Sequence, residues 1–245
     1  MHLLNAAELL DIWDAGRIAS PSRRSLLLLS AFLPEEREVL ANRPLGELNA
    51  RLLRLRTQLF GPTLHCLASC PKCSGPVETA FGIEKLLSHA VEPIAEENII
   101  HSLTHDDCKI DFRLPTAADL LAIVPRLGGQ AAGELRDRLI DKSLRNGECI
   151  SIGELPGEAL EAIERQIAEL DPLAHIELNL TCPDCRSDWL EVLHVIDFLW
   201  LEIGNLVKRI LFEVARIASA FGWSEREILA LTPERRRSYL GLLEV

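Results

Sequence analysis

Two short cysteine motifs, separated by more than a hundred residues, constrain the fold more than any other feature of this sequence. They are Cys70-Pro71-Lys72-Cys73 and Cys182-Pro183-Asp184-Cys185. Two thiolates separated by two residues can lie on one tight turn and bind one side of a tetrahedral ion, so two such turns complete a four-sulfur site. The sequence therefore predicts a structural Zn²⁺ site whose ligands are Cys70, Cys73, Cys182 and Cys185.

The long separation of the motifs does not exclude this site. Closing so long a flexible loop costs on the order of 4 kcal/mol plus a constant, whereas a structural zinc contributes roughly 10–16 kcal/mol in small peptides. Independent thiols and a redox pair are the alternatives. A redox CxxC motif depends on an activated thiolate near a helix N-terminus, but here strand-like sequence flanks both pairs and proline follows each first cysteine.

The other three cysteines are Cys66, Cys108 and Cys149, and we expect them to be buried small hydrophobes rather than ligands. His65-Cys66 is close enough to the first motif to supply a substitute ligand. The first residues lack the pattern of an export signal, and the total of seven cysteines is odd. We therefore expect a reducing compartment, in which paired cysteines hold metal rather than form disulfides.

The composition is acidic, with 26 basic against 37 acidic side chains and a net charge of −11 at pH 7. This charge disfavours a general attraction to nucleic acid or anionic lipid, so proteins are the expected partners. A nucleic-acid-binding zinc-ribbon protein is the alternative function. It requires a basic face near the motifs, where the sequence offers Lys72 and Arg186 against Glu78, Asp184 and Asp188. No apolar run reaches the roughly 20 residues that a membrane span needs.

Hydrophobic periodicity predicts an α+β fold that is mostly α-helical. Alternating residues predict strands over 77–81, 108–114, 175–181 and 189–193, which would form a small antiparallel zinc-ribbon unit around the two motifs. We expect a helical N-terminal segment at 1–60, a discontinuous zinc-ribbon and β unit at 61–114 and 172–194, a helical insertion at 115–171, and a helical C-terminal tail at 195–245.

Three local predictions concern the middle of the chain. A capping box at Thr116 predicts a helix that runs to about Leu127, and apolar spacing predicts another helix over 134–144. The polar cluster from His101 to Asp107 is interpreted as a solvated loop, with metal binding as the alternative.

The sequence gives no basis for an enzyme, since it lacks a GxSxG motif, a phosphate-binding loop and an HExxH motif. The C-terminal tail instead offers residue types that often anchor protein interfaces. The aromatic residues have core packing as their alternative role, and the arginines have phosphate binding or complementing the helix dipole. The candidate partner contacts are Trp200, Trp223, Arg235, Arg236, Arg237 and Tyr239.

Several segments resemble a known family. They are Phe198–Ile203 (FLWLEI), Phe221–Leu231 (FGWSEREILAL) and Arg235–Leu240 (RRRSYL), together with Leu52–Gly61 and Phe112–Thr116. The chain resembles T4-type phage baseplate proteins, described as hub subunits or hub-assembly chaperones, and in particular the members that carry zinc knuckles. Related members occur in phage-like contractile injection systems.

The resemblance implies a non-enzymatic structural or chaperone-like role in phage tail assembly, through contacts with baseplate hub or wedge proteins. It implies the bacterial cytoplasm as the location during assembly, with the protein then either retained in the particle or released. One difference concerns the knuckles, which often have glycine directly after the second cysteine, where a left-handed turn suits it. This chain has Ser74 and Arg186 there.

Overall fold

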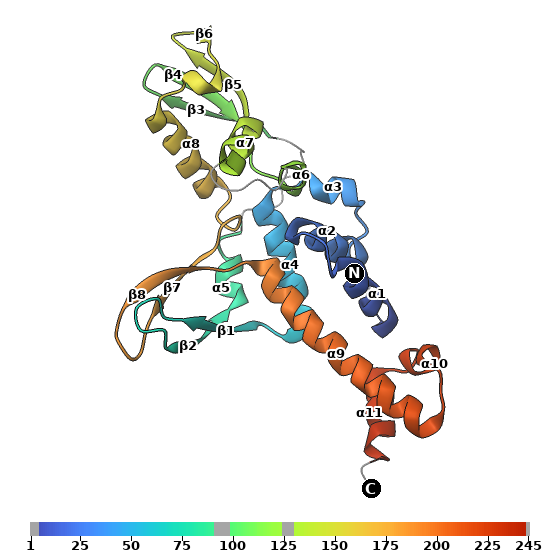
Figure 1. Cartoon of the computed structure of the whole chain (residues 1–245). Coiled ribbons are helices and arrows are strands. Elements are labelled where there is room, and N and C mark those ends of the chain that lie inside the picture. The colour runs from blue at the N-terminus through green and yellow to red at the C-terminus, as the bar shows by residue number, and fades with distance from the viewer. Residues whose placement is uncertain (1–4, 91–98, 124–129, 244–245) are drawn as a thin grey trace. The chain divides into compact units, whose positions relative to one another are not determined.

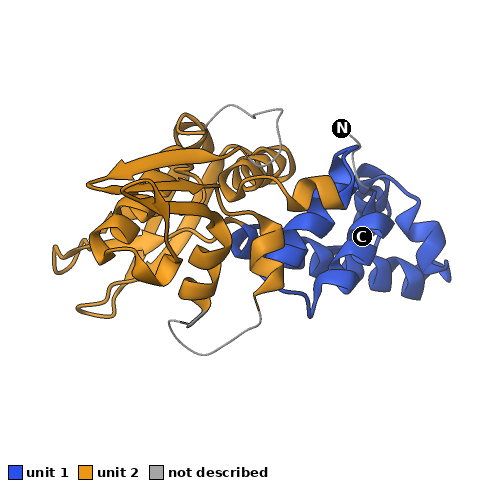
Figure 2. Ribbon diagram, turned by 90° about the horizontal axis from the view of Figure 1, so that it is seen from above, with its two compact units in different colours: residues 1–37, 196–245 blue, residues 38–195 orange. Residues whose placement is uncertain are grey.

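The computed structural model describes residues 5–90, 99–123 and 130–243. The chain divides into two compact units, coloured separately in Figure 2: residues 1–37 with 196–245 form unit 1, and residues 38–195 form unit 2. The predicted α+β class is confirmed, with more helix than strand and with small antiparallel sheets. The division into four segments stays a prediction.

Unit 1 is helical. Asn5 and Ser224 each begin a helix with a capping box. Thr232 caps the last helix through a hydrogen bond from the backbone N–H of Arg235. The helices are α1 (Ala6–Gly16), α2 (Pro21–Phe32), α9 (Val195–Phe221), α10 (Glu225–Leu229) and α11 (Pro233–Gly241).

Two tryptophans and two glycines fix the crossing of α1 and α9. The rings of Trp13 and Trp200 stack with their centroids 5.0 Å apart. Each ring also lies against a glycine of the opposite helix. A Cβ on Gly204 would lie 2.6 Å from the Trp13 ring, and a Cβ on Gly16 would collide with the Trp200 ring, so neither position leaves room for a side chain. Arg24 adds a cation–π contact, with its guanidinium carbon 5.1 Å from the Trp200 ring centroid.

Unit 2 contains three antiparallel sheets (Figure 1). Two of them are two-stranded hairpins that lie side by side, one around each cysteine motif. The first is β1 (Thr63–Ser69) with β2 (Pro76–Gly82), and the second is β7 (Glu177–Thr181) with β8 (Asp188–Val192). The predicted strands at 77–81, 175–181 and 189–193 are therefore present, although β7 begins at Glu177, and β1 is an additional strand that was not predicted.

The third sheet has the strand order β3-β4-β5-β6, and α8 covers one of its faces (Figure 1). Ile110 and Phe112 from β4 and Ile163 from α8 lie in the buried cluster between them. The strands are β3 (His101–His105), β4 (Cys108–Phe112), β5 (Ile140–Arg145) and β6 (Glu148–Cys149). The helices of unit 2 are α3 (Arg37–Ala41), α4 (Leu45–Phe60), α5 (Ile83–Leu87), α6 (Ala117–Ala122), α7 (Gln130–Leu139), the 3₁₀ turn η1 (Ile152–Glu154) and α8 (Gly157–Leu170).

Three local predictions are wrong in this part. The helix predicted over 134–144 ends at Leu139, and Ile140–Arg145 forms β5, because β4 supplies hydrogen-bonding partners on one side and β6 on the other. The segment interpreted as a solvated loop is largely β3, since His101–His105 pairs in register with Phe112–Cys108. The Thr116 capping box is confirmed, but its helix, α6, ends at Ala122 instead of continuing to about Leu127, because the backbone is already extended at Ile123. Leu127 itself lies outside the described residues.

Candidate metal centre

The two cysteine motifs adopt the same backbone turn. In the first, the N–H of Cys70 donates to the carbonyl of Gly75 at 2.9 Å, and the N–H of Ser74 donates to the carbonyl of Cys70 at 2.8 Å. In the second, Cys182 donates to Ser187 and Arg186 donates to Cys182, both at 3.0 Å. Each motif thus closes a β-hairpin in the order strand, knuckle, strand.

The missing glycines do not alter these turns. Ser74 has φ 59° and Arg186 has φ 56°, so both occupy the left-handed conformation that glycine normally takes here. For an L-residue this conformation costs roughly 1–2 kcal/mol. The turn is therefore imposed by the surrounding structure rather than by local preference.

The four cysteine sulfurs lie at distances that suit a tetrahedral metal ion. Cys70 Sγ is 3.6 Å from Cys185 Sγ, Cys73 Sγ is 3.6 Å from Cys182 Sγ, and all four sulfurs lie within 4.8 Å of one another. Zn–S bonds of about 2.3 Å in a tetrahedron place sulfurs about 3.8 Å apart. Each close pair joins one knuckle to the other, so an ion at the centre would connect both hairpins.

The cysteine thiols affect one another's ionisation. The backbone N–H of Cys73 lowers the pKa of the Cys70 thiol to about 7, because an amide hydrogen bond stabilises the thiolate. The N–H of Gly75 acts in the same direction on Cys73, but the sulfurs of Cys182, Cys70 and Cys185 raise the pKa of Cys73 to about 12. A central divalent cation would remove this repulsion between thiolates.

Little apolar packing supports the region around the sulfurs. Cys70, Val77 and Cys182 form a small buried cluster, with Cys185 and Trp189 packed beside it. An isolated two-stranded hairpin is at best marginally stable in water. The two hairpins therefore depend on what joins them, and a metal ion fits that role.

The other cysteines do not join this centre. Cys108 is buried in the core of the β3–β6 sheet, as predicted, but Cys66 is half-buried and Cys149 is exposed, so the expectation of burial is wrong for Cys149. Cys149 lies on the short edge strand β6, where few neighbours cover it. Among the described residues, neither His65 nor Cys66 belongs to the group of ligand atoms around the four sulfurs.

Two of the predicted partner contacts lie inside unit 1. Trp200 is 5% exposed and stacks on Trp13. Arg236 is 3% exposed, and its guanidinium donates to Glu213 and to the carbonyl of Leu231, both at 2.8 Å. Both residues thus have internal packing roles that the sequence left open.

The other four candidates lie around the end of α9 and on α11. Trp223 and Tyr239 meet edge to face with centroids 4.8 Å apart, and Phe221 contacts both rings. Arg235 and Arg237 are exposed on the same helix as Tyr239. The structure brings these four residues to one end of unit 1, and their contact with a partner stays a prediction.

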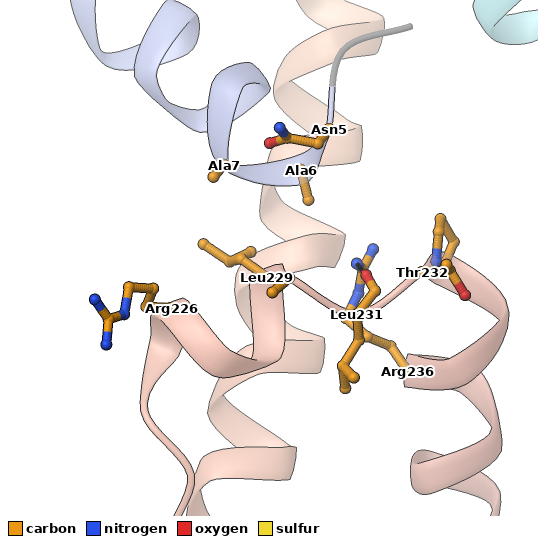
Figure 3. A pocket seen from close by; sticks show the side chains of 10 residues that line it. Asn5, Ala6, Ala7, Arg226, Leu229, Leu231, Thr232 and Arg236 are labelled. Atoms are coloured by element: carbon orange, nitrogen blue, oxygen red, sulfur yellow. Dashed lines mark hydrogen bonds between the residues drawn. The ribbon is translucent and has the colours of Figure 1, made fainter.

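Unit 1 also contains a cavity of about 500 Å³ that no sequence signal indicated (Figure 3). Its walls come from the first turn of α1 and from the α10–α11 connection, and Figure 3 shows the Arg226 side chain extending away from the other lining residues. The side chains of Asn5 and Thr232 already accept hydrogen bonds from the N-terminal amides of α1 and α11. The cavity therefore offers mainly apolar surface, and its lining is Asn5, Ala6, Ala7, Arg226, Leu229, Ala230, Leu231, Thr232, Pro233 and Arg236.

Among the described residues, no helix combines the length and the apolar character that crossing a membrane requires.

Comparison with known families gives a match to the family model described as T4 bacteriophage base plate protein, which covers residues 27–200 of this chain. This range includes all four clustered cysteines and ends before most of the C-terminal tail. No curated protein and no solved structure matches the chain.

Proposed function

Because this chain belongs to the T4 bacteriophage base plate protein family, we propose that it is a structural or assembly protein of a contractile phage tail or of a related injection-system baseplate. The observation that carries the proposal is the match over residues 27–200, which spans both hairpins and the sheet between them. The family is one of baseplate structure and is generally non-enzymatic, so the activity resides in protein–protein contacts.

The partners in this proposal are baseplate hub or wedge proteins. The proposed contact face is the end of unit 1 that holds Trp223 and Tyr239 with Arg235 and Arg237. Aromatic and arginine side chains frequently dominate binding energy at interfaces. Trp200 and Arg236 are left out of this face because they are buried within unit 1.

Co-purification from the native operon tests the assembly role. We expect the chain to associate with at least one hub or wedge protein, and Arg235→Glu combined with Arg237→Glu to weaken that association at least tenfold. Arg54→Glu is the matched control, because Arg54 is exposed on α4 in the other unit. Failure to associate with any tail or baseplate protein would refute the role. Salt-dependent DNA or RNA binding in place of protein binding would favour the zinc-ribbon alternative.

We propose that Cys70, Cys73, Cys182 and Cys185 bind one structural Zn²⁺, which supplies a connection between the two hairpins and no reaction chemistry. The supporting observations are the 3.6 Å sulfur pairs and the matching knuckle turns. Thiolate ligands must lose their protons, so binding releases protons and weakens as the pH falls.

Elemental analysis of purified protein tests the zinc site. We expect close to one equivalent of zinc, and its loss together with several degrees of thermal stability in Cys70→Ser and in Cys182→Ser. Cys149→Ser is the control, because Cys149 is exposed on β6, which belongs to a different sheet from the two hairpins that carry the knuckles. Less than half an equivalent, with both knuckle variants as stable as the wild type, would rule the site out.

A further inference from the structure

A second group of metal-ligating side chains lies in unit 2, away from the cysteines. His105, Asp106 and Glu158 each offer one ligand atom, and these atoms lie within 4.8 Å of one another. His105 ends β3, Asp106 occupies the β3–β4 turn with φ 52°, and Glu158 lies in the first turn of α8. The pairing of β3 with β4 and the packing of α8 on the sheet bring the three together.

One atom of this group has an unsatisfied hydrogen-bonding capacity. The Nε2 atom of His105 is buried and has no hydrogen-bond partner among the described residues. The nearest carboxylate oxygen, Oδ2 of Asp106, is 3.8 Å away, which is too long for a hydrogen bond. A buried polar atom without a partner is energetically costly, and a ligand placed between this nitrogen and the two carboxylates would satisfy it.

The neighbouring charged groups are engaged elsewhere. Asp107, the next residue of the turn, lies 3.6 Å from the guanidinium of Arg145 and accepts from the side-chain amide of Asn146 at 3.4 Å. The cationic Arg145 thus faces Asp107 rather than the group around His105. The carboxylates of Asp106 and Glu158 are exposed, so their charge is available to a cation.

We propose that His105, Asp106 and Glu158 form a second metal site, for a divalent transition-metal ion. Imidazole nitrogen combined with carboxylate oxygen suits ions such as Zn²⁺, Co²⁺ and Ni²⁺. Bonds of about 2.0–2.2 Å place ligand atoms about 3.0–3.6 Å apart, so the ligands must move closer than the 4.8 Å limit. Asp106 is 82% exposed and free to make that movement. The remaining coordination positions face water, so this ion exchanges more readily than one held by four thiolates.

Cobalt titration of the full-length protein, with its cysteine site already loaded with zinc, tests the proposal. We expect one additional Co²⁺ to bind, without release of zinc and without the intense sulfur-to-cobalt charge-transfer absorption of thiolate coordination. His105→Ala and, separately, Glu158→Gln are expected to weaken this binding at least tenfold. Glu158→Gln changes an exposed side chain, so it tests the site even if His105→Ala fails to fold.

His175→Ala is the matched control. His175 is exposed and its Nε2 lies 3.4 Å from Glu177, so it offers a histidine–carboxylate pair for which the described part of the chain supplies no third ligand. We expect this variant to bind Co²⁺ as the wild type does. Unchanged binding in Glu158→Gln, an equal loss in His175→Ala, or cobalt uptake only by displacement of zinc would overturn the second site. The comparison of Glu158→Gln with His175→Ala does not depend on whether the cysteine site holds zinc, and none of the outcomes depends on baseplate association.

Discussion

Asp171 connects two distant parts of unit 2 through a buried carboxylate. It follows α8, is 6% exposed, and accepts a hydrogen bond at 2.9 Å from the N–H of Gly46, which lies 125 positions earlier at the start of α4. The N-cap residue of α4 is Pro44, whose side chain makes no capping hydrogen bond. Asn49 adds a second connection by donating to the carbonyl of Leu173 at 2.8 Å. Asp171 therefore caps α4 from outside the helix.

The charge of this carboxylate is costly in the folded state. Burial raises the pKa of Asp171 to about 6; the Gly46 amide opposes this shift and the neighbouring Glu47 adds to it. Relative to the ordinary value of 3.8, a shift of this size corresponds to about 3 kcal/mol, at 1.36 kcal/mol per pKa unit. The positive end of the α4 dipole favours the ionised form by roughly 0.3–1 kcal/mol. The remaining cost of keeping Asp171 ionised in the folded protein is about 2 kcal/mol.

The sign of the pH dependence follows from the raised pKa. The folded protein holds the Asp171 proton more tightly than the unfolded chain does. The stability that the protonated Asp171 carboxyl contributes is therefore fully present below about pH 4 and is lost as the pH rises through 6. Asp171→Asn keeps an acceptor for the Gly46 N–H and removes the charge. We expect this variant to raise the free energy of unfolding by about 2 kcal/mol at pH 7.5 and by about half as much at pH 5.

Urea unfolding of zinc-saturated wild type and variant at both pH values measures this difference. Asp14→Asn is the matched control, since Asp14 is exposed on α1 and should show little change at either pH. If Asp171→Asn is less stable than the wild type at pH 7.5, or if the difference does not change with pH, the assigned cost of the buried charge is wrong.

Two further predictions use the same urea unfolding, and a third uses thermal unfolding. Gly204→Ala should lower the free energy of unfolding by about 1–2 kcal/mol, because the new Cβ would displace the Trp13 ring and this overpacking outweighs the gain in helix propensity. Gly241→Ala is the control, since open space surrounds Gly241 and the free energy of unfolding should not fall. Equal effects of the two substitutions would contradict the packing of Gly204 on Trp13. Arg186→Gly should leave the stability unchanged or raise it by up to about 1 kcal/mol, because it relieves a left-handed backbone, and a loss would show that the Arg186 side chain contributes. A strong chelator should lower the unfolding temperature of the wild type while leaving Cys182→Ser unaffected, and an equal drop in both would place the metal effect elsewhere.

The cluster of four cysteines was predictable because its sequence signal is local. The two-residue spacing indicates a knuckle, and alternation after the first motif and on both sides of the second predicts three of the four flanking strands. Cys70 and Cys182 therefore identify the site without knowledge of the rest of the fold, although β1 was not predicted. Strand β5 was not predictable in this way, since Ile140–Arg145 continues the apolar spacing of the helix before it. Its pairing with β4, which includes Phe112 with Ile140, and with β6 on its other side makes it a strand.

The roles of the tail residues depended on tertiary partners. Trp200 has the spacing of a buried position and the chemistry of an interface residue, and its partner Trp13 lies in a helix near the other end of the sequence. Likewise, the polar segment ending at His105 gave no sign of Glu158, because the two meet only after α8 packs on the sheet. Long-range pairing, rather than local preference, decided each of these positions.

The Asp171 contact and the zinc site are expected to be coupled, because they close the same part of the chain. Cys73 and Cys182 are 109 positions apart. When Asp171 holds Gly46, the chain that zinc must still close shortens to roughly 40 positions, and the cost of closure falls by about 1 kcal/mol. Asp171→Ala removes this contact and should weaken zinc binding about fivefold in competition with a colorimetric chelator, whereas Asp171→Asn should bind zinc as the wild type does. Equal zinc affinity in all three proteins would show that the hairpins are already positioned by other contacts and that zinc closes no loop.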